Sequence, residues 1–215
     1  MERMIFNILN IIIPFLLGLG IILKNSHKLP LYYLLGGFFI YTGFGEWFGL
    51  ALMNRFDAEV NIFYYDNFNI PLGYLLQFLV FYLAITDKKG KKYIMVMGFL
   101  YLASFLVDKI WIHYSPGELS MLSYCAGSVF CILICLLYMY SLIKSKAILY
   151  FKTNLMFWIS AGTLFFQLFT FVFYALMGIW KDYADIGMVY HTISMFCLYI
   201  SYLFFATGVL WMTRR

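Results

Sequence analysis

The stretch LMFWISAGTLFFQLFTFVFYALMG, residues 155–178, contains no charged side chain and decides the class of fold. A helix that crosses a hydrocarbon core of about 30 Å needs about 20 mostly apolar residues, and this stretch is long enough. Its backbone polar groups find no water in hydrocarbon, so a single segment satisfies them only as a helix. Residues 155–178 therefore predict a transmembrane helix.

The rest of the chain has the same character. It has 215 residues, of which 64% are hydrophobic, 22% aromatic and 12% charged. A soluble domain carries about twice that fraction of charge, so we expect an all-α, polytopic membrane helix bundle in which residues 1–215 form a single transmembrane domain. A window of about 20 residues predicts about seven transmembrane helices. These are residues 5–23, 31–53, 70–86, 93–113, 119–143, 155–178 and 187–212.

The basic residues predict the orientation of the bundle. Positive residues stay preferentially on the cytoplasmic face, and alternate linkers contain nearly all of them: Lys24, Lys28, Lys88, Lys89, Lys91, Lys92, Lys144, Lys146, Lys152, Arg214 and Arg215. The remaining linkers collect most of the acids: Asp57, Glu59, Asp66, Glu118, Asp182 and Asp185. This alternation predicts an amino terminus outside and a cytoplasmic carboxyl terminus. The net charge of +5 follows from topology and not from nucleic-acid binding, since no basic patch forms.

The longest linker, residues 54–69, falls on the outer side and mixes acids with aromatic residues. Two interpretations remain open for it. It is either a solvated cap lying on the lipid headgroups or a lid over a cavity, because long loops are often functional.

Several polar side chains fall within the predicted helices or, for Asn69, directly before one. An ionised group at membrane depth costs about 2.5–3.5 kcal/mol on insertion scales. These side chains are Glu46, Asn69, Gln77, Asp108, Gln167 and His191. The predicted topology places most of them in the outer half of the membrane, so we expect a ligand-binding cavity open to the outside. His191 is the expected partner of Glu46. Asp108 has a structural alternative, pairing with Lys109 or Lys181.

The sequence contains no motif of a known catalytic or nucleotide-binding site, and nothing in it predicts a cofactor. Cys131 and Cys135 lie one helical turn apart, but no further ligand lies near them, so no metal site is expected. The last predicted helix has no lysine to attach a retinal.

Short motifs give the chain a family resemblance. These motifs are Glu46-Trp47, the stretch Asn69–Tyr74, and Phe157–Ile159 followed by Gly162. With the length and helix count, they resemble small seven-helix membrane proteins of uncharacterised function from Bacteroidota-type bacteria. The resemblance implies a location in the bacterial inner membrane and no particular activity.

Three functions are compatible with these features. The leading hypothesis is a protein that binds or senses a small ligand or proton from the outer side. It would act through a partner in the membrane, either a second copy of itself or another membrane protein. The first alternative is a small transporter or channel, for which Gln77 and Gln167 are the deep polar groups. The second is a lipid-modifying enzyme using Glu46, Asp108 and His191 as acid, base or metal ligands.

Overall fold

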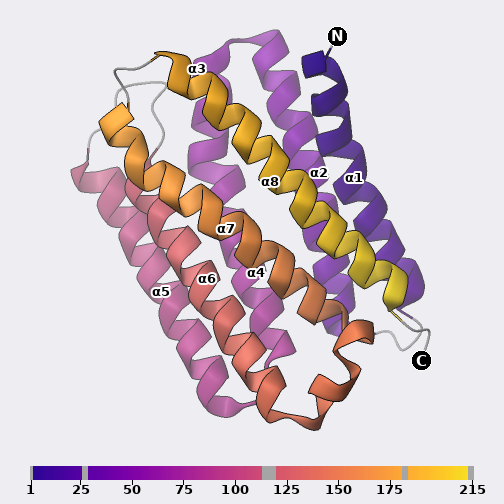
Figure 1. Ribbon diagram of the computed structural model, residues 1–215. Helices are drawn as coiled ribbons and strands as arrows, with labels where there is room; N and C mark the ends of the chain where they lie inside the picture. Colours follow the sequence, from indigo (N-terminus) through magenta and orange to yellow (C-terminus); the bar gives the residue numbers. More distant parts are fainter. Residues whose placement is uncertain (1, 26–28, 113–119, 181–183, 213–215) are drawn as a thin grey trace.

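The computed structural model describes residues 2–25, 29–112, 120–180 and 184–212, without the side chains of residues 2–5, 146–147, 177–180, 184–188 and 190–191. These residues form helices and no strand (Figure 1). The helices are α1 (Glu2–Lys24), α2 (Pro30–Arg55), α3 (Ala58–Tyr64), the π-helix η1 (Tyr65–Asn69), α4 (Ile70–Ala84), α5 (Lys88–Trp111), α6 (Met121–Lys144), the 3-10 helix η2 (Lys146–Thr153), α7 (Leu155–Trp180) and α8 (Ala184–Trp211).

Six of the described helical stretches are long and apolar enough to cross a membrane, with α3, η1 and α4 counted as one, which agrees with a multi-pass membrane bundle. Each of the seven predicted segments overlaps one of the helices α1, α2 and α4 to α8, and residues 113 and 119 of two segments lie outside the described residues. The long helix α2 is not one of these six, because it is less apolar than the others. Its five glycines, its tyrosines and Glu46 lower its mean hydropathy, although its 26 residues are enough to span a bilayer.

The expected linker at residues 54–69 is mostly helical, and its role as a cap or a lid stays a prediction. The Asp57 side chain accepts a hydrogen bond of 2.9 Å from the Val60 backbone N–H and so caps α3. The helix then continues through η1 into α4. The π-turn ends just before Pro71, and the Ile70 N–H bonds to the Tyr65 carbonyl five residues back. A wider turn gives room for the proline ring, which would crowd the preceding turn of a regular α-helix.

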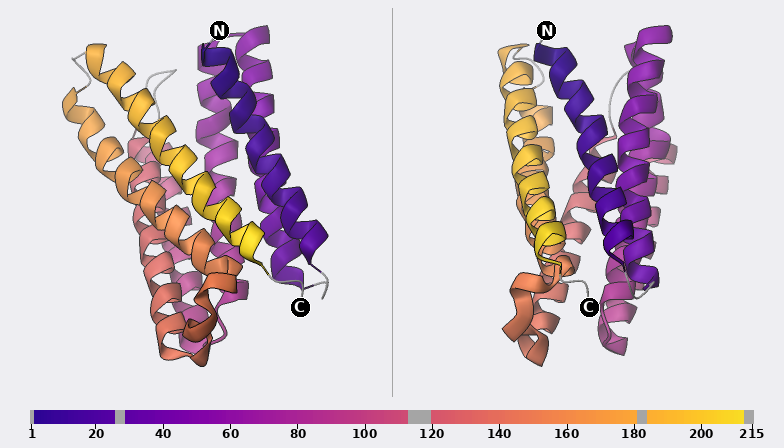
Figure 2. Two further views of the ribbon diagram at one scale, coloured as in Figure 1. Left: turned by 45° about the vertical axis from the view of Figure 1, so that its right-hand side comes forward. Right: turned by 90° about the vertical axis from the view of Figure 1, so that its right-hand side faces the viewer.

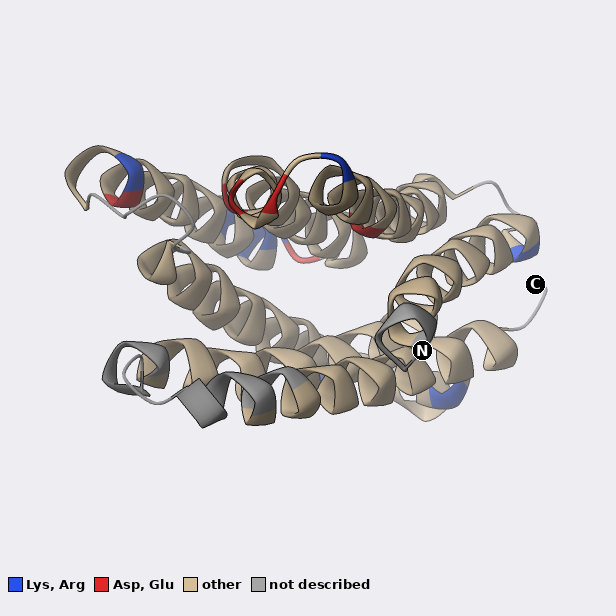
Figure 3. Cartoon of the chain, turned by 90° about the horizontal axis from the view of Figure 1, so that it is seen from above, with Lys and Arg blue, Asp and Glu red and all other residues tan. Residues whose placement is uncertain are grey.

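The two ends of the bundle differ in charge. The long helices alternate in direction, so the two termini lie at opposite ends (Figure 1). Lys24, Lys88 and Lys144 are at the end where the chain finishes, whereas Asp57 and Asp66 are at the other end. Seen from above, most of the cartoon is tan, so few positions of the described chain are charged (Figure 3). This segregation is the pattern that the sequence predicts.

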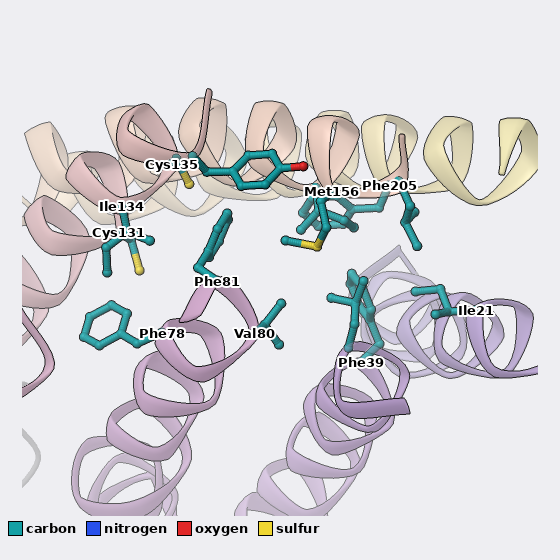
Figure 4. Close-up of a cluster of buried hydrophobic side chains, with 14 of the residues drawn as sticks. Ile21, Phe39, Phe78, Val80, Phe81, Cys131, Ile134, Cys135, Met156 and Phe205 are labelled. Carbon is teal, nitrogen blue, oxygen red and sulfur yellow. The ribbon is translucent and has the colours of Figure 1, made fainter. Parts of the chain in front are cut away.

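The helices pack closely at the basic end. In the bundle α1 packs along α2, α6 along α7, and α7 along α8. The apolar core includes Phe39, Phe81 and Phe205, each at most 8% exposed (Figure 4). Toward the opposite end, α7 and α8 diverge from α1 and α2 (left view of Figure 2). The core therefore closes one half of the bundle only.

Candidate functional site

A cavity of about 510 Å³ lies among α2, the α3–η1–α4 helix, α6, α7 and α8. Ligand sites in proteins commonly have volumes of about 300–1,000 Å³. The described residues that line the cavity are Phe38, Tyr41, Thr42, Glu46, Ile62, Tyr65, Asn69, Ile70, Gly73, Tyr74, Gln77, Tyr124, Phe166, Gln167, Thr170, Tyr174, Ser194, Met195, Leu198 and Tyr202. The cavity is large enough for a small organic molecule.

Four of the six predicted ligand-binding residues line this one cavity: Glu46, Asn69, Gln77 and Gln167. They come from α2, η1, α4 and α7, so helices far apart in sequence bring them together. The side chain of His191 lies outside the described residues, and so does its predicted pairing with Glu46. The binding role of the four remains a prediction.

Asp108 does not line the cavity, which corrects the expectation that it shares the site. It is fully buried near the end of α5. There it accepts hydrogen bonds from the backbone N–H of Ser123, at 2.8 Å, and from the Ser123 hydroxyl. Asp108 thus holds the first turn of α6, where backbone N–H groups lack helical partners.

A second acid acts in the same way beside it. Asp66 of η1 accepts bonds from the Ser120 backbone N–H at 2.9 Å and from its hydroxyl at 2.8 Å, and it pairs with Lys109. The sequence suggested Asp108 as one partner of Lys109. Asp108 and Lys109 are adjacent on one helix and face different directions, so the lysine meets an acid from another helix. This network fastens η1 to α5 and α6.

Glu46 is the charged residue among the described lining residues. Its carboxylate accepts a hydrogen bond of 3.1 Å from the Tyr65 hydroxyl. Within the described part of the chain, no Lys or Arg pairs with Glu46. A carboxylate at this depth is costly without further polar partners. Two lining groups therefore lack partners: Glu46, which has only the bond from Tyr65, and the buried Asn69 side-chain oxygen, which has none.

Glycines on α2 allow the π-helix to approach Glu46. A Cβ atom added at Gly49 would lie 2.5 Å from the Tyr65 ring, and one added at Gly45 would clash with the Asn69 amide. The Tyr41 hydroxyl donates to the Asn69 carbonyl at 2.9 Å. These contacts fix Tyr65 and Asn69 against α2. The space beside Gly45 and Gly49 is therefore filled by side chains of the protein itself.

The two glutamines lie deeper. The Gln77 side-chain N–H group donates to the Thr163 hydroxyl at 3.2 Å, and its oxygen accepts from the Cys131 thiol at 3.1 Å. Gln77 thus joins α4 to α6 and α7. The Gln167 oxygen accepts from the Thr170 hydroxyl at 3.4 Å. Both amides are largely engaged by the protein, which suits them to shaping the floor of the cavity.

Sequence reasoning missed Tyr65, the hydrogen-bond donor to Glu46. It lay in the segment expected to be a linker, so it was not considered as part of a helix. A signal was present, because Ile62, Tyr65, Asn69 and Gly73 recur at spacings of three and four residues, as on one face of a helix. All four line the cavity.

The donor set in the described part of the chain includes no group of three or more His, Cys, Asp or Glu placed to hold a metal ion. The cavity offers one carboxylate, amides, hydroxyls and aromatic rings. Comparison of the chain with protein-family models, curated proteins and solved structures found no match.

Proposed function

We propose that this chain is an inner-membrane protein with seven transmembrane helices that binds or senses a small ligand from the outer side. The amino terminus lies outside and the carboxyl terminus in the cytoplasm. The segregation of Lys24, Lys88 and Lys144 from the acidic end supports this orientation. In it, α2 is the seventh span. Four of its five glycines face α1 or η1 and Glu46 faces the cavity, which accounts for its lower hydropathy.

The observation that supports a binding function best is the position of Glu46. A bundle that only needed to be stable would gain by filling a cavity of about 510 Å³ and by replacing a half-buried carboxylate. Here Glu46 faces that space together with Asn69, Gln77 and Gln167. Polar groups placed around a mostly apolar cavity are the usual composition of a small-molecule site.

Binding fits the geometry better than conduction. The cavity lies toward the acidic end, and the basic end is closed by Phe39, Phe81, Phe205 and their buried neighbours (Figure 4). The described residues of that core are mostly apolar, which disfavours the passage of a polar solute. A ligand that enters from the outer side would stay in the outer half of the bundle and act by changing how the helices pack.

Gly73 provides a direct test. It lines the cavity, and a Cβ atom added there would meet no heavy atom within 4 Å, so Gly73→Leu should fill the space without distorting the fold. Gly37 of α2 is exposed and equally free of neighbours. Gly37→Leu is therefore the matched control, because it makes the same chemical change away from the cavity.

The experiment uses the purified protein in lipid nanodiscs and fractions of a small-molecule extract from the producing cells. A ligand present at 100 times its Kd stabilises the folded protein by about 2.7 kcal/mol. We expect at least one fraction to raise the melting temperature of the wild type and of Gly37→Leu, but not of Gly73→Leu. If no fraction does so, or if Gly73→Leu responds equally, the cavity is not a binding site. Flux of the active compound into proteoliposomes would instead indicate transport.

A further inference from the structure

We infer that the ligand of this cavity is an organic cation, a protonated or quaternary amine with an apolar body. This inference rests on the proposed binding function and adds the chemical class of the ligand. It follows from three properties of the described lining residues: their net charge, their aromatic content and the engagement of their polar groups.

The lining of the cavity contains an acid and no base. Among its 20 described lining residues, Glu46 is the one acid, and none is Lys or Arg. Lys109, the nearest lysine in the network at the end of α5, is paired with Asp66 and lies outside the lining. An ionised carboxylate in a medium of low dielectric constant needs a countercharge. A cationic ligand would supply it, whereas an anionic ligand would add repulsion.

The walls of the cavity are aromatic. Eight of the 20 lining residues are Tyr or Phe, contributed by α2, η1, α4, α6, α7 and α8. Tyr124 and Tyr174 pack with their ring centroids 4.6 Å apart, which joins α6 to α7 in the wall. The faces of aromatic rings attract cations, and the attraction strengthens where water is excluded. Aromatic residues from several helices around one cavity resemble the cages that bind quaternary ammonium groups.

Protein partners engage the hydroxyl groups of several of these tyrosines. The hydroxyls of Tyr41 and Tyr65 donate to the Asn69 carbonyl and to Glu46, and that of Tyr74 bonds with Ser128 at 3.1 Å. With these hydroxyls occupied, the rings are what these residues present to a ligand. A strongly polar neutral molecule such as a sugar could bond to the Asn69 side-chain oxygen, which has no partner, but the hydroxyls of Tyr41, Tyr65 and Tyr74 are already bonded within the protein. An apolar body with one positive charge fits the lining better.

A matched pair of compounds tests the charge. Benzyl(2-hydroxyethyl)dimethylammonium and 3,3-dimethyl-4-phenylbutan-1-ol have nearly the same shape, with carbon in place of the charged nitrogen in the alcohol. Each is titrated against the protein in nanodiscs, and Kd is obtained from the rise in melting temperature. We expect the ammonium compound to bind the wild type at least ten times more tightly than the alcohol.

Two carboxamide variants locate the effect. In Glu46→Gln the tenfold preference should disappear, with the ammonium compound weakened and the alcohol unchanged. Glu59→Gln removes the same charge from an exposed position of α3 outside the cavity, and the preference should persist. Should Glu46→Gln fail to fold, Glu46→Asp keeps the charge and should keep a preference for the ammonium compound.

Two outcomes overturn the inference in distinguishable ways. Equal binding of both compounds, abolished by Gly73→Leu, would mean that the cavity accepts neutral ligands, and the proposed binding function would stand. If neither compound nor any extract fraction stabilises the protein in a manner that Gly73→Leu prevents, both the inference and the proposed function fail.

Discussion

Replacing Gly18 of α1 by alanine should destabilise the bundle, although alanine is the better helix former. A Cβ atom added at Gly18 would lie 2.6 Å from the carbonyl oxygen of Gly36 in α2 and 2.9 Å from a side-chain carbon of Ile40. Nonbonded carbon contacts are favourable from about 3.5 Å outward, so the α1 and α2 backbones would have to separate by roughly 0.9 Å. A backbone oxygen cannot rotate out of the way as a side chain can.

The net effect follows from two opposing contributions. Overpacking costs about 1–3 kcal/mol, and replacing glycine by alanine within a helix returns about 1 kcal/mol. Because the obstacle is backbone, we expect Gly18→Ala to lower the free energy of unfolding by about 1–2 kcal/mol. Gly37→Ala, which meets no heavy atom within 4 Å, should raise it by up to about 1 kcal/mol.

The assay is reversible unfolding of both variants in mixed detergent micelles, followed by helical circular dichroism. The two free energies of unfolding should differ by about 2 kcal/mol, roughly a 30-fold difference in the folded-to-unfolded ratio. Equal values for Gly18→Ala and Gly37→Ala would refute the close backbone approach of α1 and α2.

Further predictions concern the ion pair, the deep amide and the orientation. Lys109→Met should cost about 3 kcal/mol by leaving Asp66 without its cation, and Asp66→Asn should cost less because Lys109 is 24% exposed and can reach water. In unfolding measurements the double variant should fall short of the sum of the two costs, whereas strict additivity would show that the residues do not interact. Gln77→Leu should cost about 1 kcal/mol in the same assay by removing its bonds to α6 and α7, and a gain in stability would contradict their importance. Alkaline phosphatase fused after Asp57 should be active and after Gly90 inactive, and the reverse pattern would invert the orientation.

Much of the architecture could be predicted from the sequence because hydrocarbon imposes a length and a composition on each span. Apolar stretches such as residues 155–178 therefore coincide with helices of the structure. The gathering of Glu46, Asn69, Gln77 and Gln167 could be predicted for a related reason, since polar groups at membrane depth are expected to face the interior and not lipid. Neither argument needs knowledge of which helices are neighbours.

Other features depend on which helices are neighbours, and no local pattern contains that information. Asp66 and Lys109 are separated by 43 positions, and only the packing of η1 against α5 brings them together. The helical continuation through residues 58–69 was obscured by acids and aromatic residues, whose composition resembles that of a surface loop. Tyr65 was missed for that reason, and with it the hydrogen bond to Glu46.

The central claim is that Glu46 faces a chamber that small solutes reach from the outer side. Thiol labelling of Gly73→Cys tests it most directly, in a background with the four native cysteines replaced by alanine. Applied to the outer face, a membrane-impermeant trimethylammonium thiosulfonate should modify Gly73→Cys, and the lipid-exposed Gly37→Cys should stay unmodified. The rate of modification of Gly73→Cys by this cationic reagent is divided by the rate with an anionic sulfonate reagent. Glu46→Gln should lower this ratio by about fivefold or more, because the carboxylate attracts the cation. A Gly73→Cys thiol as unreactive as that of Gly37→Cys, or a ratio unchanged by Glu46→Gln, would contradict the claim.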